Sequence, residues 1–191
     1  MHSVLYDLRY LQASLSSLED YLLSRVGQWP LGEAAPAGEL AFPPLTIEGI
    51  LLAQRRLQAQ KLPEALETEY QTTFSLIQSI HTRWPAAWDR KTAECFRQRL
   101  NLWRGFLDDL FHLPASHVDR YPYEVRLRVM LDLLAQFPAA IPATAIEQLA
   151  DLDRMLHRHW KPGHFIWEAN LQPGFPVEPH WYLYGQLITS R

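Results

Sequence analysis

The chain has 191 residues, of which 48% are hydrophobic and 20% are charged, and its formal net charge is −3. This balance is typical of a globular protein and excludes an intrinsically disordered chain, which cannot bury enough apolar surface to offset its ordering entropy. The weakly acidic charge argues against a protein that attracts nucleic acid or an anionic membrane through a positive field. The single cysteine, Cys95, excludes an intrachain disulfide and a zinc site built from several cysteines.

Three features of the sequence favour a cytoplasmic protein. Its first residues have no basic segment followed by an apolar one, which is the pattern of a secretory signal. No uninterrupted apolar stretch approaches the roughly 18 residues that a membrane-spanning helix requires. A chain with one cysteine also fits a reducing compartment. We therefore expect neither secretion nor a membrane span.

The first predicted helix has a regular stripe of leucines. Its apolar side chains recur at alternating spacings of four and three, as on one face of an α-helix, at Val4, Leu8, Leu11, Leu15, Leu18 and Leu22. Such a seam packs at a shallow angle on a neighbouring helix. We interpret it as part of a core within one chain. The alternative is a coiled coil between two copies, for which the flanking charges are few.

Residues 27–44 interrupt the helical pattern. Glycines and prolines punctuate this stretch at Gly27, Pro30, Gly32, Pro36, Gly38, Pro43 and Pro44. They predict a long irregular loop, and loops of this length are usually functional or poorly ordered. The stretch also holds apolar side chains that we expect to lie partly against the core, namely Trp29, Leu31, Leu40 and Phe42.

Proline marks the start of most of the later helices. Five further helical segments are predicted over residues 46–60, 63–84, 85–113, 122–137 and 142–160. Thr46 is the expected N-cap of the first of these, and prolines open the other four, where a missing N–H is harmless. Strands and helices do not alternate, which disfavours an α/β sheet. We predict an all-α fold, a bundle of roughly six helices that forms a single helical domain over residues 1–191.

Residues 161–191 differ from the rest of the chain because they are rich in aromatic residues and proline. Pro173, Pro176 and Pro179 are three positions apart, which favours extended backbone. The run 181–184 is compatible with a short strand or a helical turn. We predict an irregular C-terminal segment that packs on the bundle, because it is too apolar to remain in water.

This aromatic segment also holds the candidate site. Apolar pockets with a few polar groups are typical of ligand sites, and Tyr and Trp are frequent at protein interfaces. The candidates for binding a ligand or a partner are His164, Trp167, Glu168, Trp181 and Tyr184. The ligand hypothesis predicts one deep pocket lined by His164, Trp167 and Trp181, with Glu168 or Asp153 facing into it. The alternative is that the segment only packs across the helices and stabilises them, without binding a ligand or partner.

Three histidines near the end of the sixth predicted helix are the candidate metal ligands: His157, His159 and His164. His157 and His159 are two positions apart on a helix, so their side chains diverge and cannot share a metal while the helix persists. Positive side chains at a helix C-terminus also complement its exposed carbonyl groups, which explains them without a metal. We therefore predict no metal and no cofactor.

The common catalytic motifs are missing from the sequence. It contains no Gly-x-Ser-x-Gly elbow, no Gly-x-Gly-x-x-Gly fingerprint and no phosphate-binding Gly-Lys-Ser/Thr loop. Cys95 lies in an apolar helical pattern and is expected to be a buried, inert thiol. Basic residues of the fourth predicted helix alternate with tryptophans and carboxylates, so we interpret them as a solvated mixed-charge face rather than a nucleic-acid surface: Arg90, Lys91, Arg97, Arg99 and Arg104.

Two functions remain open at the level of sequence. The first is a non-enzymatic protein-interaction or scaffold module, which binds a protein partner or associates with itself through the leucine seam or the aromatic segment. The second is a helical bundle that binds a small molecule or a metal. This class includes enzymes. Its site would lie between helix ends and the aromatic segment. The missing catalytic motifs favour the first.

Overall fold

The computed structural model describes residues 3–188 and confirms the predicted all-α fold. In that part of the chain six helices have ten or more residues: α1 (Val4–Leu23), α2 (Ile47–Gln58), α3 (Glu64–Arg83), α4 (Pro85–His112), α7 (Arg126–Ala135) and α8 (Ala143–Arg158). The shorter elements are α5 (Pro114–His117), η1 (Val118–Arg120), α6 (Tyr121–Glu124), η2 (Ala169–Gly174) and η3 (Trp181–Leu183). Two strands, β1 (Trp160–Phe165) and β2 (Tyr184–Leu187), form an antiparallel pair.

Helices α1 and α2 begin where the side chain of a capping residue satisfies one of the first N–H groups. The hydroxyl of Thr46 accepts a hydrogen bond from the N–H of Gly49 at 3.2 Å, which confirms the predicted cap of α2. The hydroxyl of Ser3 does the same for Tyr6 at 3.0 Å at the start of α1. Pro85 is the first residue of α4, as its fixed φ and missing N–H allow.

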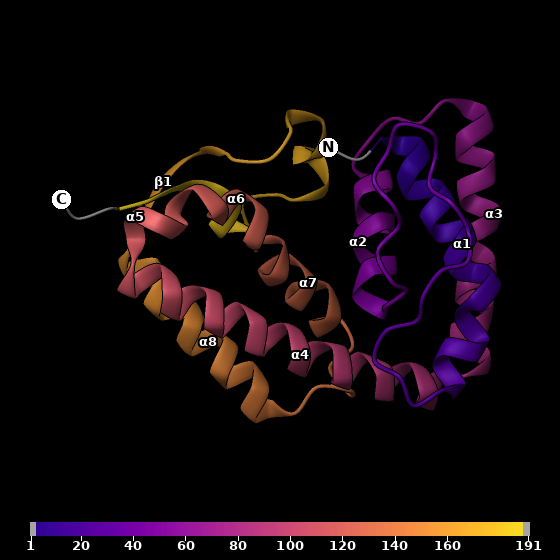
Figure 1. The fold of residues 1–191 in the computed structure, drawn as a ribbon, viewed down its shortest axis with the longest axis horizontal. Helices are drawn as coiled ribbons and strands as arrows, with labels where there is room; N and C mark the ends of the chain where they lie inside the picture. Colours follow the sequence, from indigo (N-terminus) through magenta and orange to yellow (C-terminus); the bar gives the residue numbers. More distant parts are fainter. Residues whose placement is uncertain (1–2, 189–191) are drawn as a thin grey trace.

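The helices form two groups joined by α4 (Figure 1). In one group α1 packs against α2 and α3, and in the other α7 and α8 pack against α4. Helix α4 runs beneath both groups, and α2 contacts α7 across the middle of the molecule. Buried side chains of both groups form one continuous hydrophobic core. The arrangement therefore differs from a simple bundle, because the longest helix crosses from one group to the other.

The leucine seam of α1 is part of this core. Leu8, Leu11, Leu18 and Leu22 are buried, and Val4 and Leu15 are half-buried against the same cluster. Their burial follows from the contacts of α1 with α2, α3 and α4. The seam therefore packs mainly within the chain.

Residues 27–44 form the predicted irregular connection between α1 and α2. A single backbone pairing of Trp29 with Leu45 closes its ends. Phe42 packs edge-on against Tyr6, with ring centroids 5.0 Å apart, as expected for apolar side chains of this loop. Leu40 differs from that expectation because 76% of it is exposed.

The C-terminal segment is more regular than predicted. The expected extended backbone is wrong at Pro173, which lies inside η2, and Pro179 follows a cis peptide bond within a turn. In the run 181–184, the first three residues form the 3-10 turn η3 and Tyr184 begins β2. Folding back lets β2 pair with β1, which satisfies backbone groups that a lone extended chain would leave unpaired.

An ion-pair network fastens this segment to α7 and α8. Arg128 donates to both carboxylate oxygens of Asp153 at 2.7 and 2.8 Å and to Asp132 at 2.5 Å. The hydroxyl of Tyr182 donates to the other oxygen of Asp132, and that of Tyr121 donates to the carbonyl of Tyr182 at 2.9 Å. Because Tyr182 and Arg128 are buried, the network is largely shielded from water and fixes the position of η3.

The basic residues of α4 do not form the uniform solvated face that the sequence suggested. Lys91 is only 1% exposed and donates to the carbonyl of Val26 at 2.5 Å, and Arg90 donates to the carbonyl of Leu22 at 2.6 Å. Both cations therefore satisfy carbonyl groups at and just beyond the C-terminus of α1, where the helix dipole favours positive charge. Arg97 is exposed as predicted.

Among the helices of residues 3–188, none is both long and apolar enough to cross a membrane.

Candidate functional site

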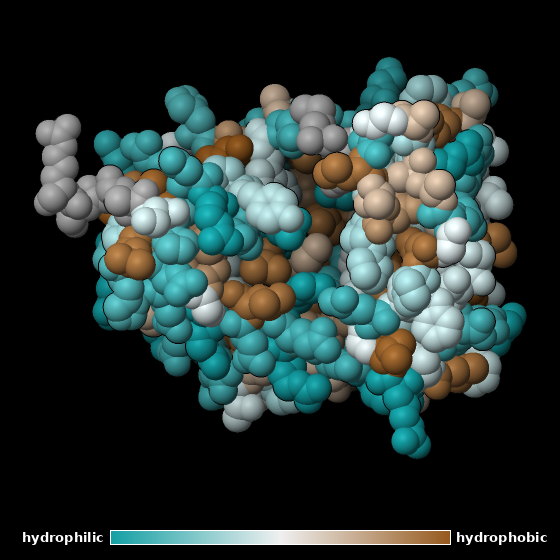
Figure 2. All heavy atoms as spheres, viewed as in Figure 1, coloured by the Kyte–Doolittle hydropathy of each residue, from teal (hydrophilic) through white to brown (hydrophobic). Residues whose placement is uncertain are grey.

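A cleft of about 300 Å³ opens between the two groups of helices. It is lined by the loop before α2, by α2 itself, by the α6–α7 turn and by the C-terminal segment: Glu39, Leu40, Leu52, Arg56, Pro122, Tyr123, Arg126, Trp167, Glu168, Asn170 and Leu171. Figure 2 shows the hollow in the middle of this face, with hydrophobic atoms in its depth. We call this space the outer cleft. Its volume lies at the lower end of the range of small-molecule sites.

A second space of about 180 Å³ adjoins the outer cleft. The two share Leu52, Arg56 and Arg126, and the remaining walls of the second come from α1, the loop and the start of α2, and from α4 and α7: Tyr6, Tyr10, Gln28, Pro43, Pro44, Thr46, Gly49, Arg99, Leu127 and Met130. We call it the inner chamber. Its lining includes three arginines and, among the described residues, no carboxylate.

Two of the three arginines are held by buried carboxylates. The Nε and Nη2 atoms of Arg56 donate to the two oxygens of Asp7 at 3.0 and 2.5 Å. The Nε atom of Arg99 donates to Glu48 at 2.7 Å. Asp7 and Glu48 are each 1% exposed, so both carboxylates are shielded from water. Each pair fixes the position of its guanidinium group at the chamber wall.

Arg126, the third arginine, is held differently. Its guanidinium carbon lies 3.7 Å from the centroid of the Tyr123 ring, in a cation–π contact. No carboxylate of residues 3–188 forms an ion pair with it, although it lines both the outer cleft and the inner chamber. It is half-buried at the first position of α7. Arg126 is therefore an oriented cation at the junction of the two spaces.

Burial shifts the pKa of several groups beside the chamber. Burial raises the pKa of Asp7 from 3.8 to about 6, and the charge of Arg56 counteracts part of that rise. Burial, followed by the charge of Glu48, also raises the pKa of Tyr10 and of the Cys95 thiol. Tyr10 and Cys95 are therefore neutral at physiological pH, and Cys95 is buried as predicted. A neutral, enclosed thiol is a poor nucleophile.

The structure distributes the predicted site residues over three places. Trp167 and Glu168 line the outer cleft, and the indole N–H of Trp167 donates to the carbonyl of Pro122 at 2.8 Å. His164 and Tyr184 line a separate hollow of about 290 Å³ with Trp167. Trp181 borders a third, open hollow with Asp153 and His157. The predicted single pocket of His164, Trp167 and Trp181 is therefore not formed, because the segment folds around its own aromatic core.

The candidate metal ligands also lie apart. The ring of His157 contacts Trp181 with centroids 4.4 Å apart, and that of His159 contacts Phe111 at 4.6 Å. Within residues 3–188 no three side chains of His, Cys, Asp or Glu are grouped as a metal site would need. The histidines thus occupy different surfaces, as their helical spacing predicted.

The arginines of the inner chamber were not predicted as site residues. The sequence predicts Arg99 on a solvated face and Arg126 within a minor basic group with Arg120 and Arg128, and it predicts no role for Arg56. A weak signal exists, because Asp7 and Glu48 interrupt apolar helical faces and buried carboxylates require cationic partners. Nothing local in the sequence identifies which arginine pairs with which carboxylate, since the partners are 49 and 51 positions apart.

Comparison of the chain with protein-family models, with curated proteins and with solved structures gave no match. The cleft itself therefore indicates what the chain could bind. Its walls combine aromatic and aliphatic side chains with a small number of fixed charged groups. That combination suits a ligand with an apolar body and a polar group, which the fixed charges would orient.

Proposed function

We propose that the chain is a binding protein whose ligand occupies the outer cleft. The observation that supports this most strongly is the convergence of four separate segments on one hollow, with Trp167 and Tyr123 as aromatic walls. This function corresponds to the small-molecule-binding alternative that the sequence left open. Its site lies between helix ends and the aromatic segment, but with Arg56 and Arg126 in place of the histidines.

Trp167 provides the reporter for a test. The chain has 7 tryptophans, so a ¹⁵N-labelled sample gives a few well-separated indole signals, and a Trp167→Phe variant assigns the one from the cleft. Small-molecule fragments are then titrated. We expect a subset to shift the Trp167 indole signal, because its N–H donor lies beside the cleft at Pro122.

Tyr123→Ala removes an aromatic wall of the cleft and should weaken the binding of those fragments by about tenfold. This corresponds to the free energy lost when one large side chain is no longer buried. Leu113→Ala is the matched control, because Leu113 is a similarly exposed apolar side chain at the end of α4, outside the lining of the cleft. The proposal would be contradicted if both variants weakened fragment binding equally. It would also be contradicted if no fragment shifted the Trp167 indole signal.

A protein partner is the second candidate, and a specific observation favours it. Leu40 and Tyr123 line the cleft and are 76% and 59% exposed, so two large side chains lie open to water there. Exposed apolar groups gathered at one place mark interaction surfaces. If a second copy is the partner, sedimentation velocity should show a dimer that Leu40→Ser dissociates. A monomer at all concentrations would exclude self-association at this face.

A further inference from the structure

The inner chamber presents unused hydrogen-bond donors. A guanidinium group has five N–H donors. Arg99 uses Nε for Glu48, and Arg56 uses Nε and Nη2 for Asp7. Their other guanidinium nitrogens have no hydrogen-bond partner among residues 3–188, and Arg126 has no ion pair there. Guanidinium groups from three helices, α2, α4 and α7, therefore line one chamber with donors that the described chain leaves unused.

The charge of the chamber is also unbalanced. Three arginines contribute three positive charges, and the two carboxylates behind them, Asp7 and Glu48, compensate for two. Glu39 and Glu168 lie in the lining of the adjoining outer cleft, so the positive excess is confined to the inner chamber. The start of α2 adds to this excess, because Thr46 and Gly49 line the chamber at the positive end of a 12-residue helix. A chamber of about 180 Å³ has room for several water-sized groups, since water occupies about 30 Å³ in the liquid.

We propose that the inner chamber binds the oxyanion group of an organic acid, a carboxylate or a phosphate, whose apolar part lies in the outer cleft. The inference rests on the proposed function and adds the chemical class of the ligand. The planar guanidinium groups of Arg56 and Arg99 are held in place by buried partners, so little ordering entropy is lost when an oxyanion binds. Tyr123 and Trp167 then contact the apolar part.

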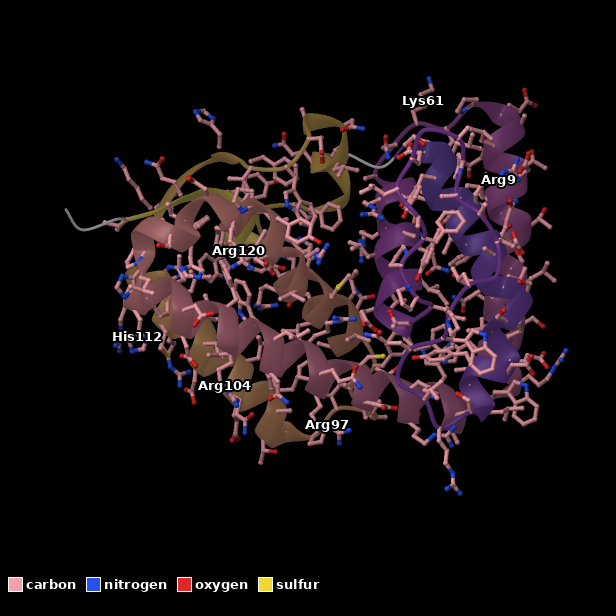
Figure 3. All side chains as sticks on the ribbon, viewed as in Figure 1. Arg9, Lys61, Arg97, Arg104, His112 and Arg120 are labelled. Carbon is pink, nitrogen blue, oxygen red and sulfur yellow. The ribbon has the colours of Figure 1, made fainter. Side chains whose placement is uncertain are left out.

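Arg126 is the residue to change. Replacing Arg56 or Arg99 would leave a buried carboxylate unpaired and destabilise the fold, which would confuse loss of binding with loss of structure. Arg126 forms no ion pair in the described chain, so Arg126→Gln should fold normally, as circular dichroism would confirm. Arg97→Gln is the matched control, because Arg97 is exposed on the side of α4 away from α7 (Figure 3).

The probes are inorganic phosphate, phenyl phosphate, benzoate and the uncharged benzyl alcohol, titrated into the full chain and followed by NMR and calorimetry. Phenyl phosphate or benzoate should bind at least tenfold more tightly than benzyl alcohol, and phenyl phosphate more tightly than inorganic phosphate. Arg126→Gln should weaken binding about tenfold or more, Arg126→Lys should retain part of it, and Arg97→Gln should leave it unchanged. The stronger of the two aromatic acids identifies the preferred oxyanion.

Two results would overturn the inference. One is that Arg126→Gln and Arg97→Gln weaken oxyanion binding equally, which would indicate non-specific attraction of the anion to positive charge. The other is no binding of any oxyanion while uncharged fragments still shift Trp167, in which case the cleft binds ligands of another class. If neither oxyanions nor uncharged fragments shift Trp167, the proposed function fails together with the inference.

Discussion

Asp7 and Glu48 illustrate how single residues determine the chemistry of the inner chamber. Each is a buried carboxylate on a helical face that is largely apolar. A buried charge is tolerated only when a partner and hydrogen bonds replace its water. Arg56 bonds both oxygens of Asp7, and Arg99 bonds one oxygen of Glu48, so both arginines are held at the wall of the chamber. The carboxylates thus act on any ligand through the arginines that they position.

The raised pKa of Asp7 predicts a measurable pH dependence. Its pKa is about 6 in the folded chain against an ordinary 3.8, so between these values the folded chain binds more protons than the unfolded one. The contribution of Asp7 to the free energy of unfolding is therefore complete below about pH 4. It declines by about 3 kcal/mol as pH rises through 6.

Urea unfolding of the wild type and of Asp7→Asn at several values between pH 4 and 7 measures this decline. The difference between the two free energies isolates Asp7, because all other groups are common to both chains. We expect the wild type to lose stability relative to the variant as pH rises. A difference that stays constant with pH, or a carboxyl ¹³C titration with a midpoint below 4, would show that Asp7 has an ordinary pKa.

At the scale of elements, the C-terminal segment packs closely on α2 through its η2 turn. Its η2 turn lies against the last turn of α2, where the approach is very close at Gly174. A Cβ atom at Gly174 would lie 2.6 Å from the Cβ of Ala59 and 3.1 Å from the carbonyl oxygen of Arg55. Neither neighbour is the end of a flexible side chain. Glycine is therefore required at this contact.

Gly174→Ala should destabilise the protein by about 1–3 kcal/mol, the usual cost of overpacking. Gly105→Ala is the control, because Gly105 is exposed in the middle of α4 and its added Cβ would meet no heavy atom within 4 Å. That change should stabilise the protein by up to about 1 kcal/mol through helix propensity. Thermal unfolding measures both. Equal stability of Gly174→Ala and the wild type would mean that η2 packs loosely on α2 in solution.

The whole molecule depends on the seam of α1, which lies among three neighbouring helices. Leu18 is completely buried, and Leu5 on the same helix is 38% exposed. Leu18→Ala should therefore cost about 3 kcal/mol of unfolding free energy, and Leu5→Ala should stay within about 0.5 kcal/mol of the wild type. Sedimentation of both variants should give the same mass as the wild type. If Leu18→Ala instead lowered the mass without reducing stability, the seam would join two chains.

The sequence was sufficient to predict which segments are helical. The stripe from Val4 to Leu22, the N-cap at Thr46 and the proline that opens α4 are local patterns, and local patterns are determined by backbone sterics and hydrophobic spacing. The burial of Cys95 followed from the same periodicity. There were two exceptions: the fifth predicted helix is divided into α6 and α7 at Val125, and the short helix α5 was not predicted.

Only the tertiary structure decided where the cleft lies. Trp167 and Glu168 were recognised from composition, but their cleft is completed by Arg56 and Arg126, which come from distant helices. The sequence also could not separate Arg99, which is bound to a buried carboxylate, from the exposed Arg97 two positions earlier. The physical reason is that helical spacing determines the face on which a side chain lies. The partner that this face meets depends on how helices far apart in the chain pack together.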